Sequence, residues 1–303
     1  MSDLIDLFGT GFFRTGLRFG LIALGLAWGV LLATRRRRLV PIGGLLIAAA
    51  TMGSLLWLEE PVLGEIWPLL LIGAGSSLNR FVPTIPQWVT PLAVVPGAAW
   101  LAVSTATTDF IWVRVALAVV IPVGGYLIAD FEKRYDGMGL GMIFYALATL
   151  GVFASVPDTE WARLLIAVAV PMVFAAWPRV TVSLGPEGGY LAVATLLLVT
   201  AHGGGARPAS MVGGMACLGL LLIEPVAVGL RPRLLRLTTW MKRNWVGAVI
   251  ASVPQFVVVA VCSRVAARFT NEIPALVIVI LVYAASVAVG LSAVMGLERK
   301  VGD

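Results

Sequence analysis

The stretch DFIWVRVALAVVIP at residues 109–122 decides the fold, because it recurs as DTEWARLLIAVAVP at residues 158–171. Both copies share the pattern Asp-x-x-Trp-x-Arg-x-x-x-Ala-Val-x-x-Pro. Each copy is followed by a second apolar run of related sequence, YALATL at 145–150 and LAVATL at 191–196. The sequence therefore predicts an internal direct repeat of two helix hairpins, a common plan in membrane transport proteins. The two predicted hairpins cover residues 109–157 and 158–206.

The composition of the whole chain indicates that its solvent is lipid. Hydrophobic residues make up 59% of the sequence, charged residues make up 13%, and the mean hydropathy is +0.96. Such a chain has too few polar side chains to cover a water-exposed surface. We therefore expect an all-α polytopic integral membrane protein, with residues 1–303 forming a single transmembrane domain and no soluble domain.

Apolar runs long enough to cross a bilayer, roughly 17 to 25 residues each, predict about eleven transmembrane helices. The third and eighth runs are short, so ten helices are the alternative. The predicted spans lie at about 17–33, 40–58, 66–81, 88–106, 110–129, 138–155, 160–177, 188–201, 209–230, 245–266 and 273–296.

The charged residues between these runs predict the topology. Most basic residues fall in every second gap, which is typical of cytoplasmic loops, whereas acidic residues fall in the other gaps. We therefore expect the N-terminus outside and the C-terminus in the cytoplasm. The basic gaps hold Arg35 to Arg38, Arg80, Lys133, Arg134, Arg179, Arg231 to Arg243, Arg299 and Lys300, and the acidic gaps hold Glu59, Glu60, Glu65, Asp109, Asp158, Glu160 and Glu272.

The first residues of the chain indicate whether it carries a cleavable signal peptide. Asp3 and Asp6 precede the first apolar run and no small-residue cleavage site follows it, so no cleavable signal peptide is expected. Residues 1–16 form either a short interfacial amphipathic helix or an extension of the first span. An excess of arginine over lysine, with abundant Ala, Gly and Val, is typical of a high-GC bacterial genome and indicates a bacterial plasma membrane.

The repeated residues have physical roles at the mouth of each hairpin. Asp109 and Asp158 are placed to cap helices that enter from outside, and Trp112 and Trp161 are expected at the headgroup level. Arginines near the same level either snorkel as anchors or contact an anionic headgroup or substrate. The arginines expected to make these contacts are Arg18, Arg114, Arg163 and Arg207.

The candidate substrate or coupling site lies deeper in the bilayer. Pro122 and Pro171 follow their caps by about 20 Å of helix and should kink both helices. Glu224 precedes Pro225 within a predicted span, where an ionisable residue is costly and therefore indicates function. Gln255 offers a second polar group at a helix break. The alternative for Glu224 is pairing with arginine at the cytoplasmic end of its span.

A cytoplasmic acidic cluster is the alternative site. Asp130, Glu132 and Asp136 share one inner loop and Glu187 lies in the next, so these four carboxylates could hold a metal ion for a diphosphate substrate. A solvated loop balanced by neighbouring cations is the competing interpretation. Because Cys217 and Cys262 lie within predicted spans and His202 is the sole histidine, expected in an external loop, no haem, zinc or other cofactor is expected.

Three functions remain open at the level of sequence. The first is a transporter or lipid flippase that handles an amphipathic or anionic substrate, proton-coupled through Glu224. The second is an intramembrane transferase acting on a lipid-linked diphosphate at the cytoplasmic face, and the third is a structural subunit of a cell-envelope complex. The weight lies against an enzyme. Membrane lipids are the expected partners, with a membrane-complex partner as an alternative, and nucleic acid is excluded because the basic residues lie at membrane edges.

Overall fold

The fold is known from a computed structural model, which describes most of the chain up to Gly203. The described residues are 10–34, 41–60, 62–82, 84–86, 88–105, 111–135, 140–156, 158–176 and 182–203, together with single positions at 257, 261, 274, 277, 278, 281, 284 and 285. The described elements are all helical, consistent with the predicted all-α class. They are α2 (Gly11–Thr34), α3 (Gly43–Trp57), α4 (Leu63–Ser76), the four-residue α5 (Leu78–Phe81), α6 (Val89–Thr105), α7 (Ile111–Arg134), α8 (Leu140–Ser155), α9 (Glu160–Ala176) and α10 (Pro186–Gly203).

Each of the first eight predicted apolar segments contains a helix, although several helices begin or end at other residues than predicted. Helix α2 begins at Gly11, so residues 11–16 extend the first helix instead of forming a separate interfacial helix. The third segment is interrupted at Ser77, because the hydroxyls of Ser76 and Ser77 donate to the carbonyl oxygen of Gly73 at 2.9 and 2.8 Å. The last three predicted segments, 209–230, 245–266 and 273–296, lie outside the described residues.

One described helix, over Gly11–Ala33, has both the length and the hydropathy of a membrane crossing. Other apolar helices in the described part are shorter, between 10 and 17 residues. These are Gly43–Trp57, Leu63–Ser76, Val89–Thr105 and Gly141–Ala154.

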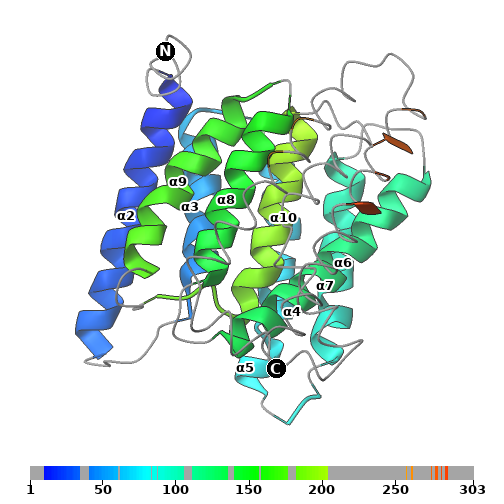
Figure 1. Cartoon of the computed structure of the whole chain (residues 1–303). Helices are drawn as coiled ribbons and strands as arrows, with labels where there is room; N and C mark the ends of the chain where they lie inside the picture. Colours follow the sequence, from blue (N-terminus) through cyan, green and yellow to red (C-terminus); the bar gives the residue numbers. More distant parts are fainter. Residues whose placement is uncertain are drawn as a thin grey trace, which may run out of the picture.

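The long helices stand side by side and alternate in direction along the chain (Figure 1). Helix α2 flanks the bundle and runs parallel to α9, its main neighbour, because Gly16 and Gly20 face Leu164 and Ala167 in the same order. A Cβ added at Gly16 would lie 2.6 Å from the carbonyl oxygen of Leu164, and one added at Gly20 would lie 2.9 Å from that of Ala167. The spacing Gly16-x-x-x-Gly20 thus lets the two helix backbones touch.

Glycine also sets the approach of the antiparallel helix pairs. A Cβ added at Gly97 of α6 would lie 2.8 Å from the carbonyl oxygen of Pro68 in α4. Likewise, one added at Gly189 of α10 would lie 2.9 Å from the carbonyl oxygen of Gly125 in α7. These two pairs are among the most extensive helix contacts in the described bundle.

The start of α3 is joined to the start of α10 by backbone hydrogen bonds. The amide of Gly43 donates to the carbonyl of Ser183, and the amide of Gly44 donates to that of Leu184, both at 2.9 Å. Gly185 has a φ of 83°, a conformation that favours glycine, and turns the chain into α10. Two helix starts that are far apart in sequence therefore meet at one end of the bundle.

Several buried hydroxyl groups of the core donate hydrogen bonds within their own helices. The hydroxyls of Thr51 and Thr200 donate to the carbonyl oxygens of Ile47 and Leu196 at 2.8 and 2.6 Å, four residues earlier in each case. Thr195 bonds back to Leu191 in the same way and also accepts the hydroxyl proton of Tyr145 at 2.8 Å. This last bond ties α8 to α10. Buried hydroxyls of this kind leave few unsatisfied polar groups in a helical core.

Replacing Gly16 with alanine should lower the melting temperature by several degrees. The new Cβ would meet the backbone of α9, and such overpacking costs about 1–3 kcal/mol. Gly25→Ala is the matched control, because a Cβ built at that position of the same helix has no atom of another described helix within 4 Å. Alanine there should gain about 1 kcal/mol of helix propensity. Thermal unfolding of the two purified variants tests this, and equal melting temperatures would contradict the packing.

Candidate functional site

The end of the bundle where α4, α9 and α10 meet holds the sole histidine of the chain. His202 lies in the last turn of α10, and its ring stacks on the indole of Trp161 in the first turn of α9. The ring centroids are 3.8 Å apart and the planes differ by 13°. The amide of Asp158 donates to the carbonyl oxygen of Gly203 at 3.0 Å, which holds the end of α10 against the start of α9. This backbone hydrogen bond therefore holds the two stacked rings next to each other.

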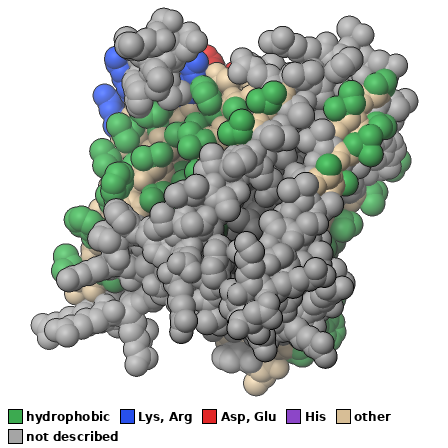
Figure 2. All heavy atoms as spheres, in the orientation of Figure 1, with side chains coloured by type: hydrophobic (Ala, Val, Ile, Leu, Met, Phe, Trp, Pro, Cys, Tyr) green, Lys and Arg blue, Asp and Glu red, His purple; other side chains and the backbone are tan. Residues whose placement is uncertain are grey.

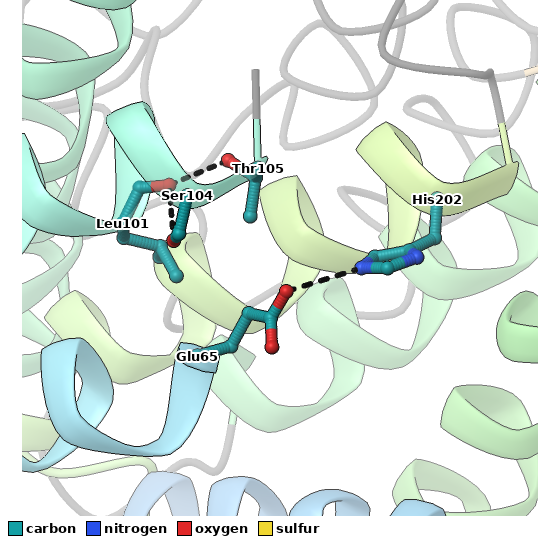
Figure 3. A network of polar contacts seen from close by, with 5 residues as sticks. All are labelled: Glu65, Leu101, Ser104, Thr105 and His202. Atoms are coloured by element: carbon teal, nitrogen blue, oxygen red, sulfur yellow. Dashed lines mark hydrogen bonds and ion pairs between the residues drawn. The ribbon is translucent and has the colours of Figure 1, made fainter. Parts of the chain in front are cut away.

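Glu65 completes this group from the first turn of α4 (Figure 3). Its side chain is buried, at 7% exposed, and its Oε1 lies 3.7 Å from Nε2 of His202. Its second oxygen, Oε2, is also buried and receives no hydrogen bond from any described residue. We call Glu65, Trp161 and His202 the histidine site.

Hydroxyl groups at the end of α6 lie on another side of Glu65 in the same view (Figure 3). Ser104 and Thr105 both donate to the carbonyl oxygen of Leu101, at 3.1 and 2.6 Å. Their protons are therefore used within α6. Within the described part of the chain, the ion pair of Glu65 is the one with His202.

Burial lowers the pKa of His202 below its ordinary value of 6.5, because the protein around the ring solvates a cation poorly. The negative charges of Glu65, Glu60 and Asp158 act in the opposite direction and favour the protonated ring. His202 follows the predicted span 188–201, so these opposing effects act at the edge of the apolar region. Protonation of the ring therefore depends on the balance between its burial and these three negative charges.

The prediction that His202 is an external loop residue is wrong. Hydropathy ends the span at residue 201, but α10 continues through Gly203 and its last turn packs on α9. Trp161 was expected at the headgroup level, yet its side chain is buried, at 6% exposed, under His202. An aromatic residue at a helix mouth faces either lipid or a neighbouring helix, and its position in the sequence does not distinguish the two.

Other residues of the repeated pattern are placed as follows. Asp158 accepts a hydrogen bond from the amide of Glu160 at 3.1 Å, which confirms its expected role in capping α9. Arg163 lies 5.9 Å above the ring of Phe153, a cation–π distance, while Arg18 is exposed and Arg114 is half-buried. Three of the expected residues, Asp109, Arg207 and the side chain of Trp112, lie outside the described part.

The deep candidate site is described only in part. Pro122 lies inside α7 and Pro171 lies inside α9, as predicted, and both side chains are buried. Each helix continues beyond its proline. Glu224, Pro225 and Gln255 lie outside the described residues.

The opposite end of the bundle carries the other candidate acids. The prediction that Asp130, Glu132 and Glu187 lie in inner loops is wrong, because α7 continues through Arg134 and α10 begins at Pro186. Asp130 pairs with Arg134 one turn later in α7 at 2.7 Å. Glu132 is buried against Gly141 at the start of α8, and Glu187 is buried in the first turn of α10. Asp136 lies outside the described residues. Within the described ranges, no three His, Cys, Asp or Glu side chains are grouped closely enough to hold a metal ion.

Comparisons with protein-family models and with curated proteins found no match to this chain. Inference about function therefore starts from the geometry. The sequence had one signal for the histidine site: a single histidine and an acidic residue, Glu65, both assigned to gaps on the same side of the membrane.

The unfolding free energy should fall as the pH is lowered through the region below 6.5. Burial lowers the pKa of His202 in the folded state, so the unfolded chain binds more protons in this pH range. Protonation therefore stabilises the unfolded chain relative to the folded protein. His202→Phe retains an aromatic ring but does not titrate, so it should flatten this part of the profile. Chemical denaturation of both proteins across the pH range measures the difference. Parallel profiles for the two proteins would show that His202 contributes no pH dependence.

Proposed function

We propose that the chain is a polytopic membrane protein that carries an amphipathic or anionic substrate across the bilayer, as a transporter or lipid flippase. The observation that carries this proposal is the distribution of polarity: large apolar side chains face outward, whereas carboxylates are buried between helices. A water-soluble protein has the opposite arrangement.

The exposed apolar residues lie on several helices and not in one patch. Leu32 of α2 is 80% exposed and Phe81 of α5 is 79% exposed. Figure 2 shows hydrophobic side chains over the flank formed by α2 and again on the opposite flank, with basic side chains only near the top of the α2 flank. Further examples from α3, α4, α6 and α7 are Trp57, Leu63, Trp67, Leu92, Val103, Ile111 and Val115. Lipid is the solvent that makes this surface favourable.

The buried carboxylates argue for transport over a purely structural role. Glu65, Glu132 and Glu187 are each at least nine-tenths buried, and they lie near the two ends of the helices. A carboxylate within the membrane, or at its edge, raises the free energy of the folded protein. Such carboxylates are therefore typical of sites where a proton, an ion or a polar substrate passes. Prolines inside four continuous helices each lack a backbone donor and leave one carbonyl oxygen without its helical partner, and transporters use such carbonyls at their binding sites. These prolines are Pro68, Pro96, Pro122 and Pro171.

In this proposal the chain crosses a bacterial plasma membrane about eleven times, with the histidine site on the outer side. The end with Arg134 and Glu187 faces the cytoplasm. The hairpins α7–α8 and α9–α10 are the two copies of the repeat, each with a buried proline in its first helix. In support of this pairing, Thr149 and Thr195 occupy matching positions and donate to carbonyls three residues earlier, at 2.7 and 3.1 Å. Glu224 is proposed as the deep coupling acid.

Membrane topology can be tested by cysteine labelling in intact cells. Both native cysteines, Cys217 and Cys262, are first replaced by serine. Glu160→Cys should then react with a membrane-impermeant maleimide from outside. Lys133→Cys should react only after the cells are permeabilised, because it lies at the other end of the bundle. Labelling of both sites in intact cells, or recovery of the protein in the soluble fraction after alkaline carbonate extraction, would refute the proposed topology.

Transport can be tested with a fluorescent lipid in proteoliposomes. Vesicles contain NBD-labelled phosphatidylglycerol, and external dithionite bleaches only the outer leaflet. The reconstituted protein should speed transfer between leaflets at least several-fold over protein-free vesicles, more so under an imposed pH gradient. Glu224→Gln should lose the response to the gradient, while the surface control Glu160→Gln retains it. No acceleration by the wild-type protein would overturn the flippase form of the proposal, and a normal response of Glu224→Gln would remove Glu224 from coupling.

A further inference from the structure

The histidine site has the properties of a proton-binding site separate from Glu224. It combines a carboxylate, an imidazole and an aromatic face from three different helices. Its carboxylate, Glu65, is more than nine-tenths buried, and its Oε2 has no hydrogen-bond partner among the described residues. A buried carboxylate oxygen without a donor is costly unless a proton or a cation neutralises the group.

One bound proton would neutralise the pair, wherever it resides. If it sits on His202, the imidazolium faces the Glu65 carboxylate across 3.7 Å. If it sits on Glu65, both side chains are neutral and the pair needs no counter-ion. Without the proton, a negative charge remains buried beside a neutral ring. Glu65 therefore favours binding of a proton at the pair, in opposition to the burial that lowers the pKa of His202.

The stacked indole favours the protonated state of the ring. Trp161 lies parallel to His202 at 3.8 Å, and the negative face of an indole attracts a cation above it. Glu60, from the segment before α4, and Asp158, from the segment before α9, add negative charge around His202. In the described part of the chain, no charged group of α3, α6, α7 or α8, which also contact α10, adds to these effects.

We propose that Glu65 and His202 share one exchangeable proton, with Trp161 as the aromatic wall of the site. The ligand is the proton itself, and no covalent step is involved. The proton site follows from the geometry of the three side chains. Its assignment as the outer proton entrance of the carrier rests on the proposed function.

The single histidine permits a direct test by NMR. The full-length protein is purified through a streptavidin-binding tag, so that isotope-labelled histidine gives one side-chain signal, that of His202. Its titration is followed in nanodiscs. Glu65→Gln should move the midpoint to lower pH, because the ring loses its nearest negative charge. Glu59→Gln is the matched control: its side chain is exposed and does not act on His202, so the midpoint should stay.

A second measurement does not depend on altering Glu65. Protonated imidazole quenches indole fluorescence, so acidification of the wild-type protein should quench part of the tryptophan emission with the midpoint found by NMR. Trp161→Phe should abolish this component. An unchanged NMR midpoint in Glu65→Gln would overturn the shared proton. A fluorescence change that persists in Trp161→Phe would overturn the role of the aromatic wall.

The experiments can disprove the proton site and the transport function separately. The NMR midpoints report on proton sharing even if no lipid moves in the vesicle assay. If lipid moves and Glu65→Gln shifts the pH at which the gradient drives transfer, the site is the outer proton entrance. If lipid moves with an unchanged pH profile in Glu65→Gln, that assignment is wrong, although the proton site stands on its own titration.

Discussion

Backbone contact between helices at glycine is the constraint on which the rest of the structure depends. Close approach lets the helices pack densely, and the many van der Waals contacts between them supply the attraction. Gly16 and Gly20 bring α2 onto the backbone of α9, Gly97 does the same for α6 on α4, and Gly189 for α10 on α7. Once these distances are fixed, the ends of the helices have little freedom. Helices α4, α9 and α10 converge at one end of this packed bundle.

That convergence determines which ionisable groups meet. Glu65, Trp161 and His202 are separated by about a hundred residues and forty residues along the chain, so no local pattern connects them. The same packing buries Glu65, an acidic residue near a helix start, beside His202. At the other end, Glu187 is buried by the junction of α3 and α10. Burial, more than residue type, gives these carboxylates their functional interest.

The helices themselves were predictable because hydropathy and length report directly on solvent. The starts and ends of α3, α6, α8 and α9 lie within three residues of the predicted spans, since charges and prolines mark where an apolar run stops. Errors occurred where the decisive interaction was not apolar. The serine hydroxyls that bond to Gly73 interrupt the third segment, and α10 outlasts its apolar run because its last turn packs on α9. The roles of Trp161 and His202 were missed for the same reason.

The sequence alone determined the all-α class of the described part and the capping of α9. Composition, apolar periodicity and the repeated Asp-Trp-Arg-Pro pattern are local properties, and each has a direct physical meaning at a helix in lipid. Only the tertiary structure decided which face of each helix is buried and which side chains meet. Those outcomes depend on distances between segments far apart in the chain, which are set by backbone approach at glycine. The pairing of Glu65 with His202 is therefore a property of the packed bundle, although both residues are plain in the sequence.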